Sequence, residues 1–560
     1  MKNTGKNCPT LIGLIYLMAT NAVYGINSNL DTQDIINKMV SLEARPMDLV
    51  EAKRTIEQQK LSSFQELKKR LQTFKSVVNT LNTESRFIVN KSIFSNNSAS
   101  DSNKVVDITT TSSASSGTYS LVVNNLATET KIISEGYATT TSSLDNGKLK
   151  ITVGSASGTI TIDSTNNTVD GLRLAINNLG FDLKAAFLND GNATKPIRLL
   201  TSGTQTGSSG AVTMTYTKDT FYPVTGINFT TTQTAKDASL TVDGVSIRKS
   251  SNTVTDVING AALKLQSAGS GTITLSTDID AITTKVSDFI DEYNEVFTYL
   301  NEQLAIDTET NETGVLFANF AVQNLQQILR SSISNEVIGA SGNYKYLSQI
   351  GITTQSDGTL IIDTNNLSNA LTTDIQNVSQ LFSSRGSTTH SSVTFVGYTR
   401  DTLAGTYNVK VSSDALGNKT AQLSNSGAST FVDATGSGNF YAGSAGDSKG
   451  LNFRLGNLTA GSYGQITLSK GVAEILNRQL ENMVDTSLNG PLVTEVDTIK
   501  DSIDDFNKTL LEQAERLLVF EENLKSRFSN LEIVLGRLNS QRDTFAGALA
   551  GIQDIFRKRK

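Results

Sequence analysis

A heptad pattern near the C-terminus is the feature that most restricts how this chain can fold. Between Val496 and Ile552, apolar residues recur at alternating spacings of three and four. A 3-4 spacing sustained over such a length is typical of a helix that packs along a coiled-coil seam. The candidate seam residues that we single out there are Ile503, Phe506, Leu510, Leu517, Phe520, Leu524, Leu531 and Leu538.

A second seam with the same spacing lies near the N-terminus. Its candidate residues are Phe64, Leu67, Leu71, Phe74, Val78 and Leu81. Polar residues interrupt the C-terminal seam at Gln513, Arg527 and Gln541. A polar residue in a coiled-coil core lowers stability but fixes register and partner number. We therefore expect the two seams to pack on each other or on neighbouring copies of the chain.

The sequence between the seams is rich in Ser, Thr, Asn and Gly and favours strands over helices. Gly154 to Gly158 is a candidate hairpin turn, and Asp243-Gly244 suits a tight turn. The segment VDGLRLAINNLG predicts a short helix that Gly180 ends. Helical periodicity returns near Asp280, with one apolar stripe formed by Ile282, Val286, Phe289, Ile290, Tyr293, Val296, Phe297 and Leu300.

These patterns predict an α+β multidomain fold. Long terminal coiled-coil helices and a helical leg domain flank nested β-rich head domains, and a second β module is inserted. The expected parts are an N-terminal extension (1–24), an N-terminal helical leg (25–95), two nested β-rich head domains (96–275), a helical leg domain (276–385), an inserted β-rich module (386–470) and C-terminal coiled-coil helices (471–560).

Two smaller expectations concern local structure. Pro46 is expected to interrupt the N-terminal helix, with a long helix following from about Met47 to Asn90. The strand-like string from Ser115 to Val123 resembles the one from Leu403 to Val411, and both contain Gly-Thr-Tyr. Any hairpin entry can look like this, but the shared tripeptide slightly favours two related β modules.

Composition excludes several classes of function. The net charge is −6, so the chain has no basic field for nucleic acid. One cysteine, Cys8, allows no disulfide framework, and one histidine, His390, leaves too few ligands for a structural zinc site. A Ser–His–Asp triad would need His390, which lies in a polar string without a G-x-S-x-G motif. The sequence thus predicts no catalytic residue, no metal and no cofactor, and a protein that is not an enzyme.

The first residues allow two interpretations. The apolar run from Leu11 to Met18 resembles the core of a signal peptide, with a small-residue site near Ala22. The run is too short to span a bilayer. Alternatively, translation begins at Met18, which would also remove Cys8. We favour the start at Met18.

Several strings resemble the family of bacterial flagellar filament caps, also called hook-associated protein 2. GINSNLDTQDIINKMVSLEARPMDLVEAK, from Gly25, is similar to the opening of that family. LTVDGVSIRKSSNTVTDVINGAALKLQSAG followed by FIDEYNEVFTYL resembles its β-to-helix transition, and the matches cover most of Gly25 to Gly551. Three features depart from the family pattern: the first seventeen residues, the inserted island at 386–470, and GINSNLD in place of a glycine-rich opening.

The resemblance implies a structural capping protein at the distal tip of the flagellar filament. Copies would form a plate with legs, a homo-oligomeric ring of roughly four to six subunits, which retains exported flagellin and promotes its polymerisation. The implied partners are other copies, flagellin, the hook–filament junction proteins and a flagellar export chaperone, with no nucleic acid and no membrane span. The implied location is extracellular, after secretion through the flagellar type III pathway.

Two alternatives remain open from the sequence. A hook–filament junction protein or flagellin-like subunit would share the helix–β–helix plan, but NTVTDVINGAALKL and FIDEYN resemble the cap. A secreted surface adhesin becomes the better interpretation if LIGLIYLM is a true signal. The polar β domains suit a soluble outer face, and they are also compatible with an adhesion role.

Overall fold

The computed structural model describes residues 25, 28, 30–97, 104–219, 227–413, 419–456, 459–485, 487 and 490–557. The expected extension at 1–24, with both possible start sites and Cys8, lies outside these residues. The chain divides into two compact units. The terminal unit holds the chain up to Phe74, Asn294–Arg330 and everything from Arg478 on, and the barrel unit holds Lys75–Tyr293 and Ser331–Asn477.

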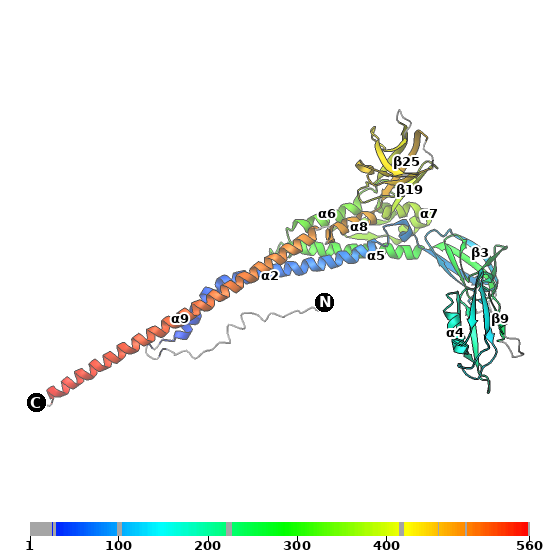
Figure 1. Ribbon diagram of the computed structural model, residues 1–560. Coiled ribbons are helices and arrows are strands. Elements are labelled where there is room, and N and C mark those ends of the chain that lie inside the picture. The colour runs from blue at the N-terminus through cyan, green and yellow to red at the C-terminus, as the bar shows by residue number, and fades with distance from the viewer. Residues whose placement is uncertain are drawn as a thin grey trace. The chain divides into compact units, whose positions relative to one another are not determined.

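Long helices build the terminal unit and the base of the barrel unit (Figure 1). The predicted apolar stripe of the central helix is confirmed, because its eight residues are all at most 3% exposed. The helices are α2 (Thr32–Val78), α3 (Glu84–Phe87), α5 (Ile279–Leu304), α6 (Phe320–Ser334), α7 (Thr364–Phe382), α8 (Val472–Val484) and α9 (Pro491–Arg557), and a two-stranded ribbon pairs β16 (Ile352–Thr354) with β17 (Leu360–Ile362).

Two expectations about α2 are wrong. Pro46 lies inside the helix, where its missing N–H removes one hydrogen bond to the carbonyl of Leu42. Both residues are exposed, so water can satisfy that carbonyl and the helix continues. The helix also ends at Val78 and not near Asn90, because a turn at Asn79 to Leu81 precedes α3, and strand β1 begins at Asn90.

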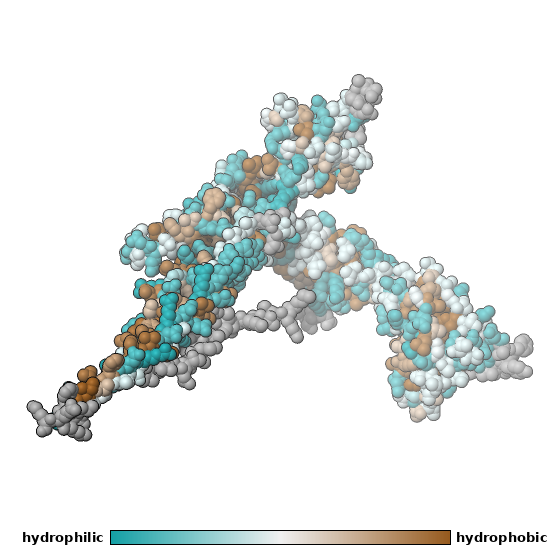
Figure 2. Space-filling view, turned by 60° about the vertical axis from the view of Figure 1, so that its left-hand side comes forward, coloured by the Kyte–Doolittle hydropathy of each residue, from teal (hydrophilic) through white to brown (hydrophobic). Residues whose placement is uncertain are grey.

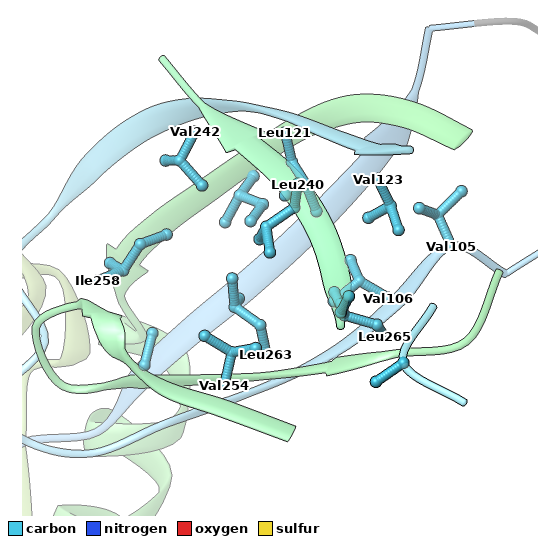
Figure 3. Close-up of a cluster of buried hydrophobic side chains, with 14 of the residues drawn as sticks. Val105, Val106, Leu121, Val123, Leu240, Val242, Val254, Ile258, Leu263 and Leu265 are labelled. Atoms are coloured by element: carbon cyan, nitrogen blue, oxygen red, sulfur yellow. The ribbon is translucent and has the colours of Figure 1, made fainter. Parts of the chain in front are cut away.

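The first β domain, which we call the first barrel, closes two sheets around one hydrophobic core (Figure 3). Its sheets have the orders β1-β15-β3-β11-β12 and β13-β14-β2. Hydrogen bonds from Thr110 to Asn90 and from Ser92 to Ile108 join β2 to β1, and an ion pair between Lys249 and Asp256 joins β12 to β13. The strands are β1 (Asn90–Asn96), β2 (Val106–Thr110), β3 (Gly117–Asn125), β11 (Ala238–Val242), β12 (Val245–Lys249), β13 (Thr253–Ile258), β14 (Ala261–Leu265) and β15 (Gly269–Thr277).

A second β domain, the head, is inserted between β3 and β11 of the first barrel. Its sheets have the orders β10-β4-β8-β7 and β6-β5-β9 and enclose a separate core. The predicted hairpin at Gly154 and the predicted helix α4 are both confirmed, with Thr168 capping α4 through the Gly171 N–H at 3.0 Å. The elements are β4 (Lys131–Ser134), β5 (Gly147–Val153), β6 (Ala156–Ile162), α4 (Val169–Asn177), β7 (Leu183–Asn189), β8 (Ile197–Gly203), β9 (Val212–Lys218) and β10 (Phe229–Gln233).

The third β domain, the second barrel, lies between α7 and α8. Its strands follow the order β18-β25-β20-β21-β22-β23-β24-β19. The Thr388 hydroxyl donates to the carbonyl of Val393 at 3.0 Å, which brings β18 beside β19 and closes the sheet. The strands are β18 (Ser384–Thr388), β19 (Val393–Gly397), β20 (Gly405–Ser413), β21 (Lys419–Asn425), β22 (Val432–Ser437), β23 (Phe440–Gly443), β24 (Asn452–Leu455) and β25 (Gly461–Lys470).

The two barrels have the same topology, which confirms the weak repeat seen in the sequence. The strands of each barrel can be numbered from one to eight along the chain, leaving out the strands of the head. In both barrels, the order around the core is then 1-8-3-4-5-6-7-2. The register agrees as well, because Gly117 and Tyr119 pair with Leu275 and Ile273 as Gly405 and Tyr407 pair with Leu468 and Ile466. In both barrels, the residue before the helix that follows the last strand donates its backbone N–H to the residue before the first strand. Asp278 donates to the carbonyl of Val89, and Gly471 donates to the carbonyl of Ser383.

One cluster of aromatic and polar side chains within the barrel unit packs the segments next to both barrels against each other. The rings of Phe87 and Phe382 stack with centroids 5.3 Å apart, and Phe289 meets Phe382 edge-on at 6.0 Å. The buried carboxylate of Glu474 accepts a hydrogen bond from the Tyr398 hydroxyl at 3.0 Å. The predicted α+β multidomain fold is confirmed, and the insertion of the head makes its β domains nested.

Candidate assembly surfaces on the terminal helices

The N-terminal seam is buried inside the subunit. All six of its predicted residues, Phe64, Leu67, Leu71, Phe74, Val78 and Leu81, are at most 2% exposed. Polar contacts hold α2 against α5 in the terminal unit. The Tyr299 hydroxyl donates to the carbonyl of Ser63 at 2.9 Å, and the Arg70 guanidinium pairs with Glu295 at 2.7 Å.

Electrostatics reinforce this α2–α5 contact. Burial lowers the pKa of the Arg70 guanidinium, but hydrogen bonding and charge from Glu295 and Glu66 outweigh that effect and raise it above its usual value. The same guanidinium lies 4.9 Å from the centroid of the Tyr299 ring. Burial in turn raises the pKa of the Tyr299 hydroxyl, so both groups keep their protons at any physiological pH.

Helices α2 and α9 lie side by side within the terminal unit. The Arg54 guanidinium donates to the side-chain oxygen of Asn507 on α9 at 3.1 Å. Nearer the end of the pair, the Ser28 hydroxyl donates to the buried carboxylate of Glu532. Helices α2 and α9 therefore belong to one helical bundle in the terminal unit.

Burial along the C-terminal seam divides it into two parts. Ile503, Leu510, Leu517 and Leu524 are 6–9% exposed, and Phe506 and Phe520 are partly buried. The predicted residues Leu531 and Leu538, in contrast, are 43% and 54% exposed. The exposed part, which we call the distal seam, contains Leu531, Val534, Leu538, Phe545 and Ile552. Figure 2 shows apolar surface along this end of the long helix.

The N-terminal helix has an exposed apolar row that the sequence analysis missed. Leu42, Leu49 and Ile56 are 59%, 68% and 50% exposed and recur every seven residues. This spacing was readable in the sequence, but the row has one residue per heptad where a full seam has two. The bundle thus has unpartnered apolar residues on both of its long helices.

The polar interruptions of the seam differ in their surroundings. The side-chain oxygen of Gln513 is buried and has no hydrogen-bond partner in the part of the chain that the structure describes. Arg527 and Gln541 are exposed. A buried amide without a partner is costly, so Gln513 marks a position where a partner helix with a donor would be favoured.

Other candidate chemistry is limited. His390 lies in the β18–β19 loop, where its Nδ1 accepts the Ser392 N–H at 3.1 Å and its ring meets Tyr463 edge-on. Within the described ranges, no group of three His, Cys, Asp or Glu residues is placed to hold a metal ion. No helix among the same residues is both long and apolar enough to cross a membrane.

Two family models match the chain. The model described as "Flagellar hook-associated protein 2 C-terminus" matches residues 235–540, and the one described as "Flagellar hook-associated protein 2 N-terminus" matches residues 28–130. The C-terminal model alone covers more than half of the chain and includes the second barrel.

Curated relatives agree with these matches. The B-type flagellar hook-associated protein 2 of Pseudomonas aeruginosa is 30% identical over 64% of this chain and 79% of its own length. Flagellar hook-associated protein 2 of Escherichia coli K12 is 28% identical over 71% of this chain and 88% of its own length. The crystal structure of the D1-D2-D3 domains of the Escherichia coli flagellar cap protein FliD covers 57% of this chain and 89% of that chain, with 28% identity and a TM-score of 0.49. The chain described above belongs to the flagellar hook-associated protein 2 family.

Proposed function

We propose that this chain is the structural subunit of a cap at the distal tip of the bacterial flagellar filament. Several copies form a plate that holds exported flagellin beneath it until each flagellin subunit folds and joins the filament. The terminal helices serve as legs, and the barrels and the head form the plate. The chain acts by binding and shaping a closed space, and it carries out no chemical step.

One observation carries this proposal, namely the division of the C-terminal seam. Up to Leu524 the apolar positions are buried within the subunit, but the distal seam from Leu531 onward is exposed. A heptad row exposed over several turns is unfavourable in water and is satisfied by another helix. A leg that ends in such a row is suited to insertion among the helices of a filament.

The same feature supports our proposal for the partners of the legs. The distal seam and the row Leu42, Leu49 and Ile56 on α2 present apolar positions at coiled-coil spacing, so they fit amphipathic helices of the same type. We propose other copies of the chain, flagellin and the hook–filament junction proteins as those partners. We further propose a flagellar export chaperone that covers the same helices before secretion through the flagellar type III pathway.

The experiment replaces two distal seam residues together, Leu531→Asp and Leu538→Asp, in the bacterium that encodes the chain. The two side chains are already 43% and 54% exposed, so the subunit should fold normally while the seam becomes charged. We expect short or missing filaments by electron microscopy and flagellin released into the medium. A matched control, Glu522→Asp and Arg537→Lys on exposed positions of the same helix, should leave filaments unchanged. Normal filaments in the double aspartate strain would refute the role of the seam.

A further inference from the structure

The second barrel carries an exposed patch that combines an aromatic ring with a cation. Phe440 and Val396 are 44% and 50% exposed. Arg454 lies directly opposite Thr394 on β19 and Phe440 on β23, so the three side chains share one outer face. The Arg454 guanidinium is 4.0 Å from the centroid of the Phe440 ring and forms no ion pair with any residue that the structure describes. We call these residues, with Ser437 opposite Phe440, the barrel patch.

The terminal unit carries an exposed patch of the opposite charge. Residues 306–320, which we call the leg loop, follow the end of α5. Ile306, Phe317 and Phe320 are 51%, 43% and 80% exposed. Glu309 and Glu312 are also exposed and form no ion pair within the described part of the chain.

The leg loop is a fixed structure. Asp307 and Glu312 are joined by a backbone hydrogen bond of 2.8 Å, and Ile306 pairs with Thr313 in an antiparallel bridge. The Asp307 carboxylate accepts the backbone N–H groups of the next turn, from Glu309 at 2.8 Å and from Thr310 at 3.1 Å. An apolar and acidic surface held in one shape is able to bind without a large loss of conformational entropy.

The charges of the two regions are complementary beyond the patches. Residues 278–382 contain fourteen Asp and Glu against three Lys and Arg, whereas 384–470 contain seven Lys and Arg against four Asp. A closed ring of identical copies brings two different surfaces of the chain together at every interface. Opposite charge on those surfaces speeds association and fixes its register.

We propose that the barrel patch of one copy docks on the leg loop of a neighbouring copy in the assembled cap. Arg454 pairs with Glu309 or Glu312, and Phe440 and Val396 pack against Phe317 and Phe320. The proposal rests on the proposed function, since it requires that copies assemble into a ring. It gives the second barrel, which repeats the first barrel but carries no head, a role in holding subunits together.

The first test measures self-association of the full chain by sedimentation velocity. We expect Arg454→Glu to weaken association about tenfold, because an attractive charge pair becomes a repulsive one. Glu309→Lys combined with Glu312→Lys should weaken it similarly, and joining both changes should restore it to within about threefold of the natural chain. Lys410→Glu is the matched control, because Lys410 also lies over an aromatic ring, that of Phe431, but on β20 away from the patch. It should have no effect.

The second test does not depend on the strength of association. Two chains, both with Cys8→Ser, are purified separately, one with Thr394→Cys and the other with Thr310→Cys. After mixing, a short bis-maleimide linker should join unlike chains, because the two cysteines meet only across the proposed interface.

Three results would overturn the proposal. They are an unchanged association constant for Arg454→Glu, loss of association without rescue by the charge swap, and no crosslink between unlike chains at the highest concentration reached. Filaments can still form in these variants, and a strain that lacks the chain altogether should release flagellin into the medium. If both hold while any of the three results is found, the docking fails and the cap function stands.

Discussion

Leu524 and Leu538 occupy equivalent heptad positions but differ in exposure, so truncating each should have different consequences. Leu524 is 6% exposed, and Leu524→Ala removes buried methyl groups at a cost of about 2–3 kcal/mol. Leu538 is 54% exposed, and Leu538→Ala should change the stability of the isolated subunit by less than about 0.5 kcal/mol. Alanine favours helix as strongly as leucine does, so neither change should disturb α9 itself.

Hydrogen exchange of the isolated chain, read by mass spectrometry on peptides from α9, separates the two cases. A loss of 2 kcal/mol corresponds to about a thirtyfold faster exchange around Leu524. Exchange around Leu538 should not change. In the assembled cap we expect Leu538→Ala to weaken assembly, because the proposed function places Leu538 against a partner helix. Equal loss of protection for both variants in the isolated chain would refute the division of the seam.

Three further predictions concern single positions. Gly471→Ala should destabilise the second barrel by about 1–3 kcal/mol and lower its melting temperature, because a Cβ there would lie 2.2 Å from the backbone of Phe382. The control is Gly397→Ala, which should be neutral because a Cβ at Gly397 would have no atom within 4 Å. An unchanged melting temperature for Gly471→Ala would contradict the close packing. Pro46→Ala should stabilise α2 by up to about 3 kcal/mol, because it restores the backbone hydrogen bond to the carbonyl of Leu42. The measurement is hydrogen exchange of the α2 amides near Leu42, which should become slower. Unchanged exchange there would show that the proline does not destabilise the helix. Hydrogen bonds from the Thr310 and Glu309 N–H groups lower the pKa of Asp307 below its usual value of 3.8. The stability that the Asp307 carboxylate gives the leg loop is therefore complete above pH 3.8 and is lost as the pH falls further. NMR shifts of the loop that do not change on acidification would argue against this.

The helical parts of the fold were predictable because helical contacts repeat at a short period. The stripe from Ile282 to Leu300 and the seam from Phe64 to Leu81 are buried as their spacing predicts. The ends of the helices were less predictable. A proline normally interrupts a helix, but α2 continues through Pro46 because the position is exposed to water. That exposure depends on the tertiary structure and could not be read from the sequence.

The β domains show where sequence reasoning stops. Gly-Thr-Tyr at Gly117 and at Gly405 hinted at a repeat, but the common topology depends on strand pairs far apart in the chain, such as β3 with β15. No local pattern encodes those pairs. The same limit applies to the assembly surface, since Leu517 and Leu538 are indistinguishable by spacing and differ only in what covers them.

The most direct test of the cap function uses a strain that lacks the chain. The quantity to measure is monomeric flagellin in the culture medium, with electron microscopy of the cells. The cap account predicts abundant soluble flagellin and missing or stubby filaments, both reversed when the chain is supplied again. Normal filaments with little free flagellin would contradict it.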